Sequence, residues 1–284
     1  MDKSIAGGSS NLFYREKGSG FPVLLLHGFA EDGAIWDNQI DYLSAHCRVI
    51  IPDLPGSGQS PTLGQSPAFS RSSRLPSVEG TGAASIEKLT ESIAIFLDQL
   101  AIQQCILIGH SMGGYIALAF AEKYPDRLVA LGLFHSTAYA DNEEKKTGRR
   151  KSIEFIRNNG SAAFIRQSIP NLFSAYTREH KPDLINGIIS RYSDFSPDSL
   201  IGYYEAMIAR PDRTAVLRQF AGPVLFVIGQ ADAVIPMEQA LQQCHLPAIS
   251  HIHIIGNAGH QGMLEAPDRS NTILHSFLNF VLYS

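Results

Sequence analysis

The chain has 284 residues, of which 44% are hydrophobic and 18% are charged, a composition typical of a folded soluble protein with a large core. Its 23 Lys and Arg residues against 27 Asp and Glu residues give a net charge of −4, and no basic cluster lacks acidic neighbours, which argues against a nucleic-acid partner. No apolar run is long enough to span a membrane and no apolar signal core opens the chain, so we expect a cytoplasmic protein without a membrane partner. The three widely spaced cysteines fit reduced thiols.

The first part of the chain predicts strands that alternate with helices. A strand is expected at residues 11–16. The continuous apolar run at residues 22–26 is typical of a strand buried on both faces of a parallel sheet, and another apolar strand is expected at residues 47–52. Apolar residues at helical spacing predict helices over residues 36–44 and 86–100. This alternation indicates a doubly wound parallel sheet.

Between residues 61 and 85 the composition changes. Ser, Gly and Pro dominate this stretch, and its few apolar residues show no periodicity. Because strand and helix patterns resume on both sides, we predict one long loop here and not a linker between two domains.

A second interruption follows the strand predicted at residues 128–135. Residues 137–213 contain several helical patterns without a buried strand between them, so we predict a helical insertion, a cap, over the sheet. Residues 1–136 and 214–284 would then form the core. The alternation resumes with two strands and a closing helix, at residues 223–229, 251–255 and 267–281.

The start of this insertion is strongly charged. Arg149, Arg150 and Lys151 form a short basic run, but Asp141 and acids at positions 143 and 144 lie close by. Such mixed charge predicts a solvated helix face and not a nucleic-acid site.

The stretch at residues 109–113, Gly-His-Ser-Met-Gly, lies between an apolar run and a helical pattern. A serine between two glycines at a strand-to-helix turn is typical of a nucleophile elbow. The turn is so tight that Cβ atoms at Gly109 and Gly113 would clash, and it holds Ser111 in a strained conformation. The start of the following helix would aim free backbone N–H groups at developing negative charge.

A serine nucleophile needs a base, and that base needs an orienting acid. Asp232 directly follows one predicted buried strand, and His260 follows the last predicted strand. The carboxyl ends of parallel strands share one rim, where ligands bind, so the topology is expected to bring these two residues to Ser111. The order Ser, Asp, His is the one that this architecture predicts.

These motifs resemble those of the α/β-hydrolases, and the similarity covers residues 13–281. The resemblance implies the α/β-hydrolase fold, a doubly wound and mostly parallel β-sheet with a helical cap insertion. The loop at residues 61–85 is longer than this family leads us to expect. The matching stretches are His27-Gly28-Phe29, Asp53-Leu54-Pro55-Gly56-Ser57-Gly58, Gly109-His110-Ser111-Met112-Gly113-Gly114, Gly229-Gln230-Ala231-Asp232 and Gly259-His260.

The resemblance also implies roles for the candidate residues. Ser111 would be the nucleophile, His260 the base and then the acid, and Asp232 the residue that orients the imidazole. The oxyanion hole would use the backbone N–H groups of Phe29 and Met112.

Two other acids compete with Asp232 for the third position. In the family pattern Asp53 belongs to a structural loop. Asp141 lies six residues past the end of the preceding predicted strand, in a charged run. We therefore predict Asp232 as the acid.

We expect neither a cofactor nor a metal ion. His251 and His253 alternate along a predicted strand and could suggest a metal pair, but no third ligand lies nearby at suitable spacing. His27 is expected to shape the oxyanion loop, and His110 is expected to pack beside the elbow.

The predicted reaction is two-step acyl transfer on a small-molecule ester of a small or medium carboxylic acid. Tyr203, Met207 and Val234 are expected to line an apolar pocket over Ser111, although aromatic residues of an insertion more often form its own small core.

Three alternatives remain open. The first is a carbon–carbon bond hydrolase, although Gln261 stands where that group is associated with tryptophan. The second is a cofactor-free perhydrolase or haloperoxidase. The third is a non-enzymatic ligand receptor on the same fold. The oligomeric state is also open, with a homodimer as one option.

Overall fold

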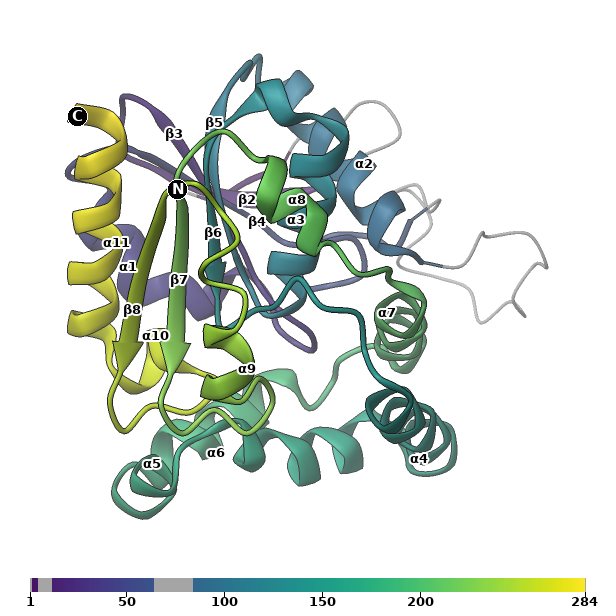
Figure 1. Cartoon of the computed structure of the whole chain (residues 1–284). Helices are drawn as coiled ribbons and strands as arrows, with labels where there is room; N and C mark the ends of the chain where they lie inside the picture. The colour runs from purple at the N-terminus through teal and green to yellow at the C-terminus, as the bar shows by residue number, and fades with distance from the viewer. Residues whose placement is uncertain (1, 5–11, 64–83, 284) are drawn as a thin grey trace.

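The computed structural model describes residues 2–4, 12–63 and 84–283. Of the loop predicted at residues 61–85, residues 64–83 lie outside this described part. The described residues form an eight-stranded sheet in the order β1-β2-β4-β3-β5-β6-β7-β8 (Figure 1). The strands are β1 (Asp2–Ser4), β2 (Phe13–Lys17), β3 (Pro22–Leu26), β4 (Arg48–Pro52), β5 (Cys105–His110), β6 (Leu128–Phe134), β7 (Val224–Gly229) and β8 (Ser250–Ile255).

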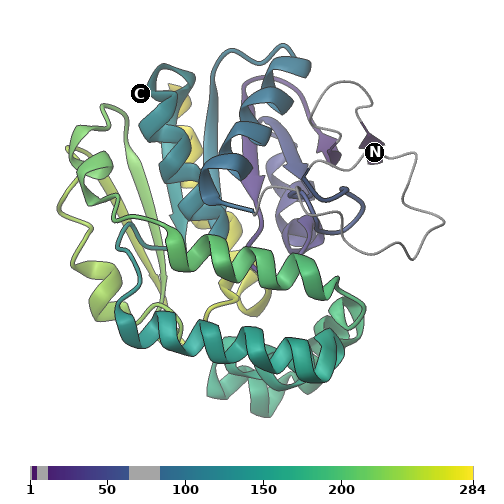
Figure 2. The same ribbon diagram turned by 90° about the vertical axis from the view of Figure 1, so that its right-hand side faces the viewer.

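The sheet is mostly parallel, as predicted. Strand β2 runs antiparallel to its neighbours β1 and β4, and every other neighbouring pair is parallel. Strands β5 and β7 are buried along their whole length because helices cover both faces. Helices α1 and α11 pack together on one face, and α2, α3 and α8 cover the other (Figures 1 and 2). These helices are α1 (Asp37–Leu43), α2 (Ile86–Gln99), α3 (Met112–Lys123), α8 (Thr214–Gln219) and α11 (Pro267–Tyr283).

Residues 135–213, all of which the structure describes, form helices and turns but no strand. Their helices lie across the carboxyl ends of the parallel strands (Figures 1 and 2). Neither these helices nor any other in the described part of the chain is long and apolar enough to cross a membrane. They are α4 (Glu143–Ser168), η4 (Ile169–Leu172), α5 (Ala175–His180), α6 (Pro182–Tyr192) and α7 (Pro197–Ala209). The remaining short helices are η1 (Gly33–Trp36), η3 (Pro125–Arg127), α9 (Met237–Leu241) and α10 (Gly262–Glu265).

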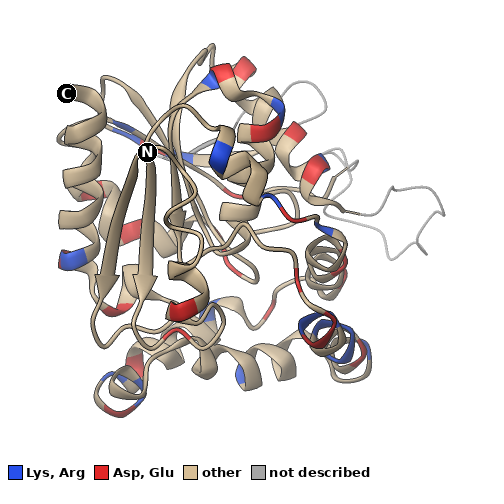
Figure 3. Ribbon diagram, in the orientation of Figure 1, with Lys and Arg blue, Asp and Glu red and all other residues tan. Residues whose placement is uncertain are grey.

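Basic and acidic residues are interspersed on α4 (Figure 3), but the charged run does not all face solvent. The prediction of a solvated face is wrong for Asp141 and Arg149. Asp141 is only 5% exposed, and its Oδ2 accepts a hydrogen bond from Arg149 Nε at 2.5 Å. Asp141, in the turn before α4, and Arg149, two turns into that helix, therefore point inward, and their opposite charges compensate each other.

A buried ion cluster ties the two ends of the helical segment together. Asp141, before α4, accepts a second hydrogen bond at 2.9 Å from Arg210, which follows α7. The Arg210 guanidinium lies 3.9 Å from the centre of the Tyr115 ring on α3, a cation–π contact. Close by, the backbone N–H of Arg213 donates to Ala138 O at 2.7 Å. These contacts hold together the two ends of the helical segment, where the chain leaves the sheet after β6 and returns to it.

Replacing Asp141 by asparagine is expected to lower the free energy of unfolding by about 3–5 kcal/mol, because the buried Arg210 and the partly buried Arg149 would lose their carboxylate. Burial raises the pKa of Asp141, but Arg210 and Arg149 outweigh it and lower this pKa from 3.8 to about 2. Because the folded pKa lies below the unfolded one, the stabilisation is complete above about pH 4 and is lost as the pH falls toward 2. Urea unfolding of both proteins at neutral pH and near pH 3 measures this difference. The exposed control Asp194→Asn should change stability by less than about 0.5 kcal/mol, and an equal effect of the two substitutions would contradict the assignment.

The three cysteines, Cys47, Cys105 and Cys244, are free and buried. Cys105 is fully buried in β5. Burial raises the pKa of the Cys105 thiol to about 12 and that of the Cys47 and Cys244 thiols to about 11. These groups therefore stay protonated thiols and act as small apolar core residues.

Candidate active site

Ser111 lies at the sharp turn between β5 and α3. Its φ of 50° and ψ of −113° place this non-glycine residue in a strained region of the backbone map. A Cβ atom on Gly109 would lie 2.2 Å from the backbone of Gly113, so the turn cannot close without glycine. Strand β6 and the residues after it support this turn, because Ser111 N donates to Phe134 O at 3.0 Å and Ser136 Oγ donates to Ser111 O at 2.7 Å.

The structure brings the three predicted residues into one hydrogen-bonded chain. His260 Nε2 lies 2.9 Å from Ser111 Oγ, and His260 Nδ1 lies 2.8 Å from Asp232 Oδ2. The side chains come from the turns after β5, β7 and β8, which meet at the carboxyl rim of the sheet. All three residues are at least nine-tenths buried.

Asp232 is held as a carboxylate. Its Oδ1 accepts hydrogen bonds from the backbone N–H groups of Val234 at 2.8 Å and Ile235 at 2.9 Å. Burial raises the pKa of Asp232, but His260 and His135 outweigh it and bring this pKa well below its usual value. A carboxylate can only accept, so His260 must donate from Nδ1, which leaves Nε2 of the neutral ring free to accept the serine proton.

The backbone N–H groups of Phe29 and Met112 are open donors beside the serine. Neither has a hydrogen-bond partner within the part of the chain that the structure describes. Met112 is the first residue of α3, where backbone donors lack intrahelical acceptors. The segment before Phe29 lies against the elbow, because a Cβ on Gly28 would lie 3.2 Å from Ser111 Cβ.

His27 fixes the direction of the Phe29 N–H. The His27 Nε2 atom accepts a hydrogen bond from Leu54 N at 2.9 Å, so Nδ1 carries the proton and donates to Gly28 O at 2.9 Å. In a trans peptide the C=O and the following N–H point to opposite sides, and the described backbone contains no cis peptide. Holding the Gly28 carbonyl toward His27 therefore turns the Phe29 N–H away from that ring.

Residues 22–267 match the family model described as the alpha/beta hydrolase fold. The chain belongs to this family. A thermophilic esterase from Thermogutta terrifontis, solved with malate bound, superposes with a TM-score of 0.86 at 31% identity, covering 99% of each chain. The pimeloyl-[acyl-carrier protein] methyl ester esterase of Aeromonas salmonicida is 29% identical over 267 residues, covering 92% of this chain and 96% of the relative. The 2-hydroxy-6-oxononadienedioate/2-hydroxy-6-oxononatrienedioate hydrolase of Burkholderia vietnamiensis is 26% identical over 287 residues, covering 96% and 92%.

Helix α7 of this α/β-hydrolase packs directly on the loop between β3 and η1, residues 27–32, which we call the Phe29 loop. The Tyr204 ring lies 4.2 Å from the Phe29 ring, and the Tyr203 ring lies 6.5 Å from it, measured between centroids. The Tyr203 hydroxyl is occupied, since it donates to Pro55 O and lies 2.7 Å from Ser57 Oγ. Tyr203 therefore anchors α7 to the loop after β4, a role that sequence analysis did not foresee.

The other two residues expected to line the pocket, Met207 and Val234, lie in different parts of the chain. Met207 is 2% exposed within α7, and its carbonyl accepts a hydrogen bond from Arg210. Val234 is half-buried in the turn that holds Asp232. A substrate contact of Tyr203, Met207 or Val234 stays a prediction.

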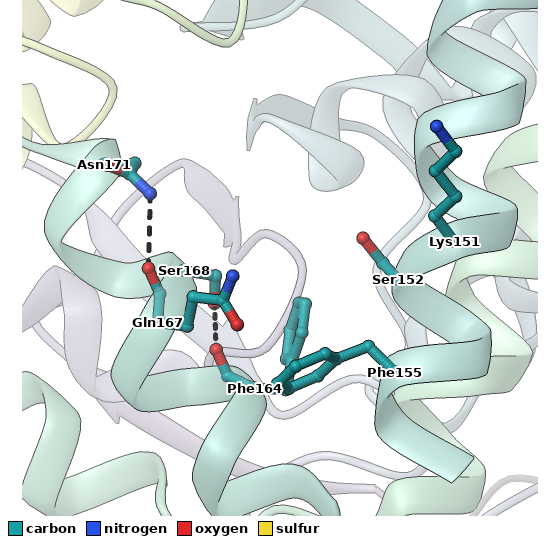
Figure 4. Close-up of a pocket in the computed structure, with 7 residues that line it drawn as sticks. All are labelled: Lys151, Ser152, Phe155, Phe164, Gln167, Ser168 and Asn171. Atoms are coloured by element: carbon teal, nitrogen blue, oxygen red, sulfur yellow. Dashed lines mark hydrogen bonds between the residues drawn. The ribbon is translucent and has the colours of Figure 1, made fainter. Parts of the chain in front are cut away.

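A cavity of about 280 Å³ lies in the bend of α4 (Figure 4). The bend occurs at Gly160, whose φ of 79° interrupts the helix. Phe164 borders this cavity and also packs edge-to-face on Phe29, with 6.1 Å between ring centroids. The cavity therefore approaches the Phe29 loop from the side of α4. Its lining consists of Lys151, Ser152, Phe155, Phe164, Gln167, Ser168 and Asn171.

Two buried polar residues near the triad escaped sequence analysis. His135 has a φ of 48°, and its Nδ1 lies 3.3 Å from Asp232 Oδ2. Glu31 is 2% exposed and belongs to the loop after β3. The sequence signal for both is weak: His135 is a polar residue directly after β6, and Glu31 lies five residues after the end of β3. By contrast, His251, which raised the question of a metal pair, packs its ring against Phe277 and Phe280.

Proposed function

We propose that this α/β-hydrolase is a serine hydrolase that cleaves esters of small or medium carboxylic acids through an acyl-enzyme. One observation carries the proposal: the unbroken hydrogen-bonded chain from Ser111 through His260 to Asp232. The esterases among its relatives support the substrate class.

In the first step, Ser111 Oγ attacks the ester carbonyl carbon while His260 Nε2 takes the hydroxyl proton. The Met112 and Phe29 N–H groups stabilise the oxyanion, and Asp232 stabilises the imidazolium. The C–O bond to the alcohol then breaks, and the alcohol leaves with the proton from His260. In the second step His260 deprotonates a water molecule, which attacks the acyl carbon. The bond from this carbon to Ser111 Oγ then breaks, the carboxylic acid leaves and His260 returns the proton to Ser111 Oγ. The reaction needs no cofactor.

We further propose that residues 137–213 act as a cap that shapes the pocket, while residues 1–136 and 214–284 form the core. The position of α4–α7 across the carboxyl rim supports this division, as does the ion pair between Asp141 and Arg210, which joins the two ends of the helical segment. Cytoplasmic location and a homodimer stay predictions.

Initial rates with 4-nitrophenyl esters from acetate to octanoate test the proposed substrate class. Each methylene that the pocket buries is expected to raise kcat/KM by about fourfold, equivalent to ~0.8 kcal/mol, until the pocket is full. We expect the optimum at a short or medium chain and a fall before octanoate. No hydrolysis of any member would contradict the proposed activity, and a rise that continues through octanoate would contradict the proposed chain length.

The second candidate is carbon–carbon bond hydrolysis, because the relative from Burkholderia vietnamiensis is named as a hydrolase of 2-hydroxy-6-oxo-dienedioate compounds. Gln261, which follows His260, is where the resemblance leads us to expect tryptophan in such enzymes. Loss of absorbance of a 2-hydroxy-6-oxo-dienoate ring-cleavage product would show this activity. Turnover of that product at a kcat/KM above that of the best ester would replace the esterase proposal.

A further inference from the structure

A buried polar network joins the Phe29 loop to the loop that carries His260. Its side chains are Glu31, His110 and Gln261, which are 2%, 0% and 1% exposed. His110 Nδ1 lies 3.0 Å from Glu31 Oε2, and His110 Nε2 lies 2.9 Å from the backbone carbonyl of His260. Gln261 Nε2 donates to Glu31 Oε1 at 2.6 Å. Two loops and the end of strand β5, far apart in sequence, therefore meet at one carboxyl group.

The hydrogen-bond pattern fixes the charges in this network. The His260 carbonyl can only accept, so His110 Nε2 must carry a proton. Glu31 already accepts from Gln261 and, at 2.8 Å, from the Gly28 N–H, and these donors favour the ionised carboxylate. An ionised Glu31 requires a proton on His110 Nδ1 as well. Both ring nitrogens of His110 then donate, and the ring is an imidazolium.

The surrounding charges agree with this pattern. Burial raises the pKa of Glu31, but His110, Gln261 and Gly28 outweigh it and lower this pKa to about 2. Burial lowers the pKa of His110, but Glu31 outweighs it and raises this pKa above its usual value. The other titratable groups that face His110 are His260, His135 and Asp232, with ring centroids 5.0 Å and 6.2 Å away for the two histidines. The rings of Trp36 and Phe134 also pack against His110.

We propose that Glu31 and His110 are positioning residues. They form a buried carboxylate–imidazolium pair that, with Gln261, holds the catalytic base His260 and the loop of Phe29 in the correct position relative to each other. The inference rests on the proposed function for its effect on rate, but the charge state of the pair stands apart from any activity.

The pair acts through two backbone segments. The His260 backbone is held on both sides, because its carbonyl accepts from His110 and its N–H donates to Leu172 O at 2.7 Å. The Gly28 N–H is held by Glu31, one peptide before the Phe29 N–H. Neutralising the pair weakens both anchors, so that the base and the oxyanion donors shift relative to Ser111. A misplacement of about 1 Å in such groups can cost about 100-fold in rate.

Nitrogen NMR of the ¹⁵N-histidine-labelled wild-type protein tests the charge state directly. We expect both ring nitrogens of His110 to remain protonated at about pH 8, where an ordinary histidine with a pKa near 6.5 has lost one proton. The His110 signals are assigned by their absence in His110→Gln, or by their ring contacts if that variant does not fold. An unprotonated ring nitrogen of His110 at this pH would overturn the ion pair.

Kinetics of Glu31→Gln test the positioning role. This substitution keeps the shape and one acceptor but removes the charge. We expect kcat for 4-nitrophenyl butyrate to fall about 10- to 100-fold while KM changes by less than about threefold, because geometry and not binding is lost. The control Glu91→Gln removes an acid that is half exposed on α2 and should leave kcat unchanged.

The outcomes separate the two proposals. A folded Glu31→Gln variant with wild-type kcat would overturn the positioning role. If the wild type neither hydrolyses esters nor labels with a fluorophosphonate, the proposed function fails, while the NMR result still decides the ion pair.

Discussion

Replacing Ser111 by alanine is expected to lower kcat for 4-nitrophenyl butyrate by about 10⁶-fold, because the variant has no hydroxyl to form the acyl-enzyme. Removing the group that bonds covalently to substrate costs about as much as removing the whole triad, since the remaining residues cannot act alone. The strained turn at φ 50° should tolerate the smaller side chain, because the two flanking glycines and not the hydroxyl close it.

Stopped-assay rates over long incubations measure the residual activity, and thermal unfolding checks that the variant is folded. Ser276→Ala, at an exposed position of α11, is the matched control and should keep full activity. A Ser111→Ala variant that retains even a tenth of the wild-type kcat would mean that ester hydrolysis takes place by another route.

Replacing Asp232 by asparagine is expected to lower kcat by about 10⁴-fold with little change in KM. The amide has the size of the carboxylate, but its NH₂ group can donate to His260 Nδ1, which then holds the ring in the tautomer that cannot accept from Ser111. The carboxylate that stabilises the imidazolium in the transition state is lost as well.

Asp141→Asn separates the two candidate acids, because Asp141 binds Arg149 and Arg210 and not His260. Its folded fraction should keep a kcat close to that of the wild type. If Asp141→Asn lowered kcat as strongly as Asp232→Asn, the assignment of the orienting acid would be wrong.

The parallel sheet and the three residues of the candidate triad could be predicted from the sequence for one physical reason. Strands buried on both faces appear as continuous apolar runs, as in β3 (Pro22–Leu26) and β5 (Cys105–His110). Once the parallel strands are located, the residues that follow them must share one rim, so Ser111, Asp232 and His260 could be brought together without any contact information.

Other elements could not be predicted because their stability depends on tertiary contacts. Helices α8, α9 and α10 are six, five and four residues long, too short to show a helical period. Strand β1 (Asp2–Ser4) forms by pairing with β2.

Buried polar residues were the main class that the sequence concealed. Glu31 and Asp141 look like solvated acids in a linear sequence, because most of their partners lie far along the chain and Arg149 lies two turns into the helix after Asp141. Glu31 meets His110 and Gln261, 79 and 230 positions away. Such pairs appear only when the fold brings the loops together.

The most direct test of the central claim is peptide mapping by mass spectrometry after treatment with a fluorophosphonate. The reagent forms an Oγ–P bond with an activated serine and releases fluoride, so it reports the nucleophile without assuming a substrate. We expect one adduct on Ser111, no adduct in Ser111→Ala and much slower labelling in Asp232→Asn. An adduct on another residue, or an unmodified wild-type protein, would contradict the assignment of Ser111 as the nucleophile.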